Sequence, residues 1–156
     1  MLFRSEPETV DQLKLAGLLH DLGKIGLPDA VLKEARMLTD EEHAIVRRHP
    51  EFGHSLLDGL ELEQVQDWVL HHHEHWDGSG YPDKLAGEEI PLGARIILVA
   101  DAFVAITTDR PYRAAQSEAT ALRELRAHAG SQFDPAVVEA LELYFGEATQ
   151  HLEALA

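Results

Sequence analysis

The chain has 156 residues, 45% of them hydrophobic, and its 28 acidic residues against 13 Lys and Arg give a formal net charge of −15. A chain of this length forms one domain with a sizeable core, so we expect a single domain over residues 1–156. The charge argues against binding to duplex nucleic acid, which requires a basic surface. The lack of cysteine excludes disulfides and thiol nucleophiles and fits a cytoplasmic protein, and no apolar run is long enough to span a membrane.

Apolar residues recur at helical spacing along most of the chain. The segments predicted as helices are 13–21, 30–33, 39–49, a segment starting at Pro50, 62–73, 96–107, 117–128 and a last segment starting at Pro135. Thr39 and Glu42 have the spacing of a capping box, which predicts a helix start. The run 96–100 fits a strand by periodicity alone, but the alanine-rich segment after it continues without a break and favours a helix. Glycines and prolines predict a loop over 76–92. The expected fold class is therefore an all-α helical bundle.

The most informative segment runs from His71 to Pro82. Four of the ten histidines lie within 71–75, directly before a loop with two glycines and a proline. Neutral imidazole is the commonest metal ligand in proteins, so this segment predicts a metal site at the end of a helix. Three other polar groups stand at the boundaries of predicted elements, namely His20–Asp21, His49 and Asp101.

Each of these groups has an ordinary structural explanation when it is taken alone. A single histidine such as His49 is most often a hydrogen-bonded helix-end residue, and Asp101 alone would serve as an N-cap or a salt-bridge partner. The joint occurrence of His-Asp, His, His-His and Asp favours a metal site, because buried polar groups are costly without partners. His71 has two interpretations, since it flanks the pair and also fits a donor to a ligand. The histidines assigned to polar helix faces or to the tail are His43, His54, His75, His128 and His151.

The motifs that contain these residues resemble the HD-GYP family, a branch of the HD phosphohydrolases, over nearly the whole chain. The matching stretches are 18–26 (LLHDLGKIG), 49–53 (HPEFG), 72–82 (HHEHWDGSGYP), 90–96 (IPLGARI), 99–103 (VADAF) and 109–113 (DRPYR). The resemblance implies an HD-type helical bundle that binds two or more divalent metal ions, with iron or manganese as candidates. It also implies hydrolysis of the bacterial second messenger cyclic di-GMP.

The resemblance implies roles for individual residues as well. The implied metal ligands are His20, Asp21, His49, His72, His73 and Asp101. Asp21 and Lys24 are the implied catalytic residues, and the implied contacts to the dinucleotide are Lys24, Arg110 and Arg113. The loop that names the family corresponds to Gly80, Tyr81 and Pro82. The resemblance connects this loop with partner recognition, and the expected protein partners are GGDEF-type or other signalling proteins.

The chemistry of phosphodiester hydrolysis agrees with this residue set. The reaction needs hydroxide at neutral pH and positive charge near the reacting phosphorus, and a pair of divalent ions supplies both. Asp21 and Asp101 cancel only part of the charge of two such ions, so the site stays positive within an acidic protein. Nitrogen and oxygen ligands without sulfur suit iron or manganese and do not choose between them.

Two departures from the family pattern leave alternatives open. HD-type sites usually take a further histidine from an upstream helix, and no histidine precedes His20, so we expect the usual first helix to be missing. Val104 stands where an acidic residue is usual. The chain is then an active cyclic di-GMP phosphodiesterase, a catalytically impaired binding or interaction module, or an HD phosphohydrolase for another nucleotide. The Gly80–Pro82 loop and the 110–113 segment argue against the last of these.

Overall fold

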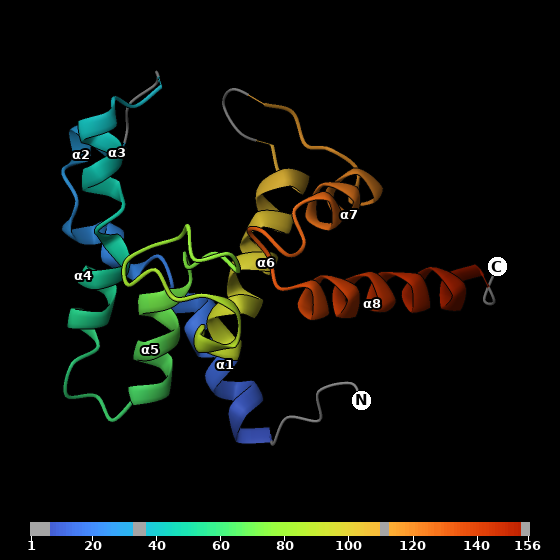
Figure 1. Cartoon of the computed structure of the whole chain (residues 1–156), viewed down its shortest axis with the longest axis horizontal. Coiled ribbons are helices and arrows are strands. Elements are labelled where there is room, and N and C mark those ends of the chain that lie inside the picture. Colours follow the sequence, from blue (N-terminus) through green and yellow to red (C-terminus); the bar gives the residue numbers. More distant parts are fainter. Residues whose placement is uncertain (1–6, 33–36, 110–112, 154–156) are drawn as a thin grey trace.

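The computed structural model describes residues 7–32, 37–109 and 113–153. Its elements are α1 (Pro7–Leu19), the 3-10 helix η1 (Leu22–Gly26), α2 (Asp29–Leu32), α3 (Asp40–Val46), α4 (His49–Leu56), α5 (Glu63–His71), the 3-10 helix η2 (Gly87–Glu89), α6 (Leu92–Thr107), α7 (Glu118–Ala127) and α8 (Pro135–Glu153). No strand lies in these residues, so the all-α prediction is confirmed (Figure 1). No helix in this part of the chain is long and apolar enough to cross a membrane.

The helix boundaries follow signals that the sequence contains. Glu42 N–H donates to the Thr39 hydroxyl at 3.3 Å and Thr39 N–H donates to the Glu42 carboxylate at 2.8 Å, so the capping box is confirmed. The helix that it starts ends at Val46, and His49 already belongs to α4, one residue before the predicted start at Pro50. The run 96–100 lies inside α6, as predicted, and the segment between α5 and α6 is a loop apart from η2.

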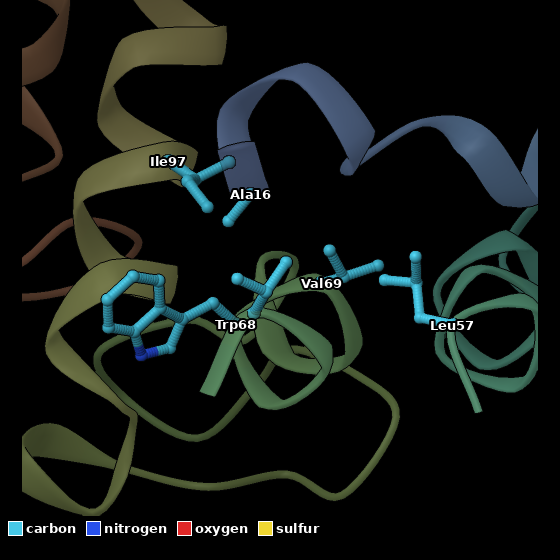
Figure 2. Close-up of a cluster of buried hydrophobic side chains, with 6 residues drawn as sticks. Ala16, Leu57, Trp68, Val69 and Ile97 are labelled. Atoms are coloured by element: carbon cyan, nitrogen blue, oxygen red, sulfur yellow. The ribbon is translucent and has the colours of Figure 1, made fainter. Parts of the chain in front are cut away.

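A first hydrophobic cluster joins α1, α5 and α6. Buried Ala16 from α1, Trp68 and Val69 from α5 and Ile97 from α6 point toward one another, and Leu57 after α4 packs against them (Figure 2). Removal of these side chains from water supplies most of the stabilisation in this region. The packing also places the carboxyl-terminal ends of α1 and α5 next to α6. Predicted metal ligands lie at all three positions: His20 and Asp21 follow α1, His72 and His73 follow α5, and Asp101 lies in α6.

Direct contact between two backbone segments sets the position of α4. A Cβ atom added at Gly23 would lie 1.9 Å from the carbonyl oxygen of His49, so only glycine lets η1 pack on the first turn of α4. As a result Asp21, which comes directly before η1, lies beside His49, although 27 residues lie between them in the sequence.

A second hydrophobic cluster connects α6 with the carboxyl-terminal helices. It contains Leu98 from α6, Leu125 from α7 and Val138 from α8. An ion pair between Arg95 Nη1 and Oδ2 of the buried Asp134, 2.7 Å apart, joins α6 to the start of α8. Beyond this contact α8 extends away from the rest of the bundle (Figure 1).

Candidate metal centre

His72 and His49 come from the end of α5 and the start of α4, and their rings face each other. The Nδ1–H of His72 donates to the Val69 carbonyl at 2.7 Å, and that of His49 donates to the Val46 carbonyl at 2.8 Å. With Nδ1 protonated, each Nε2 atom has a free lone pair. The two Nε2 atoms lie 3.2 Å apart. Two acceptors therefore point at the same small volume, and a cation in it would satisfy both.

His73 completes a group of three histidines. One ligand atom from each of His49, His72 and His73 lies within 4.8 Å of the other two. Burial lowers the pKa of His72 to about 3 and that of His73 to about 2. Burial also lowers the pKa of His49, although the Val46 carbonyl and Asp21 act in the opposite direction. All three rings are therefore neutral at neutral pH, which is the form in which imidazole binds a metal ion.

Asp21 brings a carboxylate to this histidine group. Its Oδ1 lies 3.4 Å from His49 Nε2, and its Oδ2 accepts a hydrogen bond from Lys24 Nζ at 2.6 Å. Burial acts to raise the pKa of Asp21, but the hydrogen bond and the positive charge of Lys24 lower it below its ordinary value. The carboxylate is therefore ionised at neutral pH, and its two oxygens face different partners.

His20 and Asp101 form the remaining part of the predicted ligand set. The Nδ1–H of His20 donates to the Gly17 carbonyl at 2.7 Å. Its Nε2 lies 3.6 Å from Asp21 Oδ2 and 3.9 Å from Asp101 Oδ1. This nitrogen is buried and has no hydrogen-bond partner among the described residues. Because an unpaired buried polar atom is costly, the position fits a metal ligand better than a purely structural histidine.

A hollow of about 260 Å³ between α1 and α6 adjoins His20 and Asp101. Its other lining residues are mostly apolar and include Val104. His49 and His72, in contrast, are almost completely buried. The site is therefore closed on the side of α4 and α5 and accessible on the side of α1 and α6.

The loop after α5 folds back onto the histidines. Tyr81 N–H donates to the His73 carbonyl at 3.2 Å, and the Tyr81 ring stacks on the His73 ring with 5.0 Å between centroids. A Cβ atom at Gly80 would lie 2.2 Å from the backbone nitrogen of His75. Only glycine therefore allows the loop to lie this close to the chain segment that contains the ligands.

Two residues that the sequence did not single out belong to this arrangement. Glu74 is 1% exposed, and its Oε1 accepts the N–H groups of Asp83 at 2.6 Å and Lys84 at 2.9 Å. The guanidinium carbon of Arg47 lies 5.4 Å from the centroid of the Tyr81 ring. An acidic residue directly after the histidine pair was a usable signal for Glu74. Nothing in the sequence distinguishes Arg47 from the neighbouring Arg48.

The structure places the predicted ligands His20, Asp21, His49, His72, His73 and Asp101 around one site, with Lys24 beside them. Arg113 donates to the Ala105 carbonyl at 2.6 Å, and within the described chain no hydrogen bond or ion pair joins it to these ligands. Arg110 lies outside the described residues. His71 contacts Asp83 Oδ2 through Nε2 at 2.9 Å. This contact fixes the loop after α5 and does not orient a predicted metal ligand.

Comparison with known families and proteins agrees with this geometry. The family model described as HD domain matches residues 3–137. The chain belongs to the HD domain family. It is 47% identical over 137 residues to the cyclic di-GMP phosphodiesterase response regulator RpfG of Xanthomonas campestris, covering 86% of this chain and 36% of that protein. It is 44% identical over 153 residues to a cyclic di-GMP phosphodiesterase of Pseudomonas aeruginosa, covering 93% of this chain and 36% of that protein.

A second group of relatives has a different named substrate. The HD domain is 36% identical over 140 residues to a 3'3'-cGAMP-specific phosphodiesterase of Vibrio cholerae, covering 88% of this chain and 27% of that protein. A crystal structure of a cyclic GMP-AMP specific phosphodiesterase from V. cholerae shares the fold, with a TM-score of 0.70, 24% identity and coverage of 92% of this chain and 40% of that chain. The chain thus spans about a third of the length of these relatives. The HD-GYP resemblance read from the sequence is confirmed.

Proposed function

We propose that this HD domain is a metal-dependent phosphodiesterase that hydrolyses cyclic di-GMP. The observation that supports it most directly is the pair of Nε2 atoms of His49 and His72, which lie 3.2 Å apart while the Nδ1–H of each ring donates to a backbone carbonyl. The unpaired, buried Nε2 of His20 supports the same interpretation. The relatives named as cyclic di-GMP phosphodiesterases, at 44–47% identity, favour cyclic di-GMP as the substrate.

The residues proposed to hold two or more divalent ions are His20, Asp21, His49, His72, His73 and Asp101. Iron and manganese are the candidates, because the donor set contains nitrogen and oxygen and no sulfur. Such ions, when bound, activate water and stabilise negative charge on phosphate oxygens. The backbone carbonyls that accept from Nδ1 of His20, His49 and His72 hold these rings in the orientation that a metal ligand needs.

Lys24 is proposed as the cation that contacts the phosphate being cleaved. Its ammonium group has three donors, and Asp21 takes one of them at 2.6 Å, so donors remain for a phosphate oxygen. Arg110 and Arg113 stay proposed contacts to the dinucleotide. The loop Gly80–Pro82 stays a proposed recognition element for GGDEF-type or other signalling proteins.

Turnover of cyclic di-GMP by protein loaded with Mn²⁺ or Fe²⁺ tests the proposal. Asp21→Ala should lower kcat at least about a hundredfold, because it removes an ionised group from the site. Asp11→Ala is a matched control, since Asp11 pairs with Lys14 on α1 with the same spacing of three residues and at 2.9 Å, but is exposed. Equal, background-level turnover by wild type and Asp21→Ala would show that the site is not an active cyclic di-GMP phosphodiesterase.

Two specific observations favour other functions, which the same experiment separates. The relative named as specific for 3'3'-cGAMP favours another cyclic dinucleotide, and a higher kcat/KM for cGAMP than for cyclic di-GMP would support it. The apolar side chain of Val104, which lines the hollow beside His20 and Asp101, favours a catalytically impaired binding module, in which the site holds fewer ions. Binding of cyclic di-GMP without turnover, with one ion or none per chain, would support that function.

A further inference from the structure

Two ring contacts connect Arg47 to the edge of the candidate metal centre. Tyr81 stacks on His73, with 5.0 Å between centroids and 24° between planes. The guanidinium carbon of Arg47 lies 5.4 Å from the centroid of the same tyrosine ring. Arg47 follows α3 directly, and its N–H donates to the His43 carbonyl at 2.9 Å, so its backbone position is set by the helix end. The positive charge is therefore one aromatic ring away from the histidine group.

The guanidinium of Arg47 has no carboxylate within ion-pair distance among the described residues. Its neighbour Arg48 differs in this respect, because its Nε lies 3.9 Å from Glu51 Oε2 and its guanidinium lies 4.8 Å from the Phe52 ring. Lys24, at the same site, is paired with Asp21. In a chain with a net charge of −15, an exposed arginine without an acidic partner among the described residues, beside the histidine group, is a position suited to an anion.

We propose that Arg47 binds the phosphate of the cyclic dinucleotide that is not being cleaved. The proposal rests on the proposed function. A cyclic dinucleotide has two phosphodiesters on opposite sides of its ribose–phosphate ring, and only one of them can occupy the histidine site. The planar guanidinium has parallel N–H donors that match two phosphate oxygens. Contact with the face of Tyr81 restricts the guanidinium while its donors stay free, which reduces the entropy lost on binding.

The test compares two substrates in four proteins, namely wild type, Arg47→Ala, Arg47→Lys and Arg48→Ala. Cyclic di-GMP has two phosphodiesters and bis(p-nitrophenyl) phosphate has one. The kcat/KM for cyclic di-GMP divided by the kcat/KM for bis(p-nitrophenyl) phosphate therefore reports the contact with the second phosphate. In Arg47→Ala this ratio should fall about tenfold relative to wild type, the effect expected for one charge-assisted contact, through a higher KM for cyclic di-GMP. The ratio for Arg47→Lys should lie between those of wild type and Arg47→Ala, because lysine keeps the charge and loses the planar donor pair. Arg48→Ala, the matched control, should keep the wild-type ratio.

The possible failures are distinguishable. If wild type cleaves both substrates and Arg47→Ala has the wild-type ratio, or if Arg48→Ala lowers the ratio equally, Arg47 is an ordinary surface arginine and only the assignment of Arg47 is wrong. If wild type cleaves bis(p-nitrophenyl) phosphate and neither cleaves nor binds cyclic di-GMP, the proposed function is wrong and the assignment of Arg47 is overturned with it.

Discussion

The Nε2 atoms of His49 and His72 lie 3.2 Å apart, although 23 positions separate the two residues in the sequence. Each ring is oriented by a hydrogen bond from its Nδ1–H to a backbone carbonyl in the preceding turn, at Val46 and Val69. Their orientation therefore depends on helix ends rather than on flexible side chains. A site of this kind loses little conformational entropy when a metal ion binds.

Replacement of His72 should weaken metal binding strongly. His72→Gln removes a buried ring nitrogen that faces His49, and we expect the affinity for Mn²⁺ or Fe²⁺ to fall at least about a hundredfold, since even residues around a ligand contribute ten- to a hundredfold. Equilibrium dialysis followed by elemental analysis measures this directly. His43→Gln on the exposed side of α3 is the control and should bind as wild type. Unchanged binding by His72→Gln would contradict the assignment of His72 as a ligand.

The metal-free protein should lose stability as the pH falls from about 7.5 to 5. Burial lowers the pKa of His72 to about 3 and that of His73 to about 2. In the unfolded chain both titrate near pH 6.5, so below that pH the unfolded state binds protons that the folded state does not. Each such histidine contributes a slope of up to about 1.4 kcal/mol per pH unit, and stability rises with pH.

Urea unfolding at several pH values, in the presence of a chelator, measures this slope. His73→Gln should reduce it, because one of the two histidines no longer titrates in the unfolded chain. His43→Gln should leave the difference between pH 7.5 and 5 close to that of wild type. A stability that does not change over this range would show that the folded and unfolded states bind the same number of protons, and so that folding does not lower the pKa values of the two histidines.

The helices, and the side chains that lie together at the candidate site, could be predicted from the sequence because each depends on local chemistry. Thr39 and Glu42 form their capping box within one helical turn, and the His-Asp and His-His pairs are recognisable as adjacent residues. The contacts around Tyr81 could not be predicted in the same way. Arg47 reaches Tyr81 across a distance that depends on how α4 packs on α5, and in the sequence nothing shows which of the adjacent Arg47 and Arg48 makes this contact.

Gly80→Ala should destabilise the loop that contains Tyr81. The added Cβ would lie 2.2 Å from the backbone nitrogen of His75 and 2.6 Å from the His73 carbonyl oxygen, and backbone atoms cannot move aside cheaply. We expect a loss of about 1–3 kcal/mol in the free energy of unfolding. Gly146→Ala in α8 is the matched control, because nothing lies within 4 Å of its Cβ position. That variant should be more stable by about 0.5–1 kcal/mol, since alanine favours a helix interior. A similar effect of both substitutions on urea unfolding would contradict the close contact at Gly80.

Glu74 should act on the site through the loop that it holds. Its Oε1 accepts the backbone N–H groups of Asp83 and Lys84 at 2.6 and 2.9 Å in a buried position. Glu74→Ala removes the acceptor of both N–H groups, and because Asp83 and Lys84 are exposed to water we expect a loss of about 0.5–1.5 kcal/mol for each hydrogen bond. Glu74→Gln keeps one carbonyl oxygen that can accept both bonds, so it should recover most of the lost stability.

If the loop positions Tyr81 on His73, Glu74→Ala should also change the near-ultraviolet circular dichroism of the aromatic residues, and Glu74→Gln should restore it. Equal spectra and equal stability for Glu74→Ala and wild type would show that the two hydrogen bonds do not determine the position of the loop.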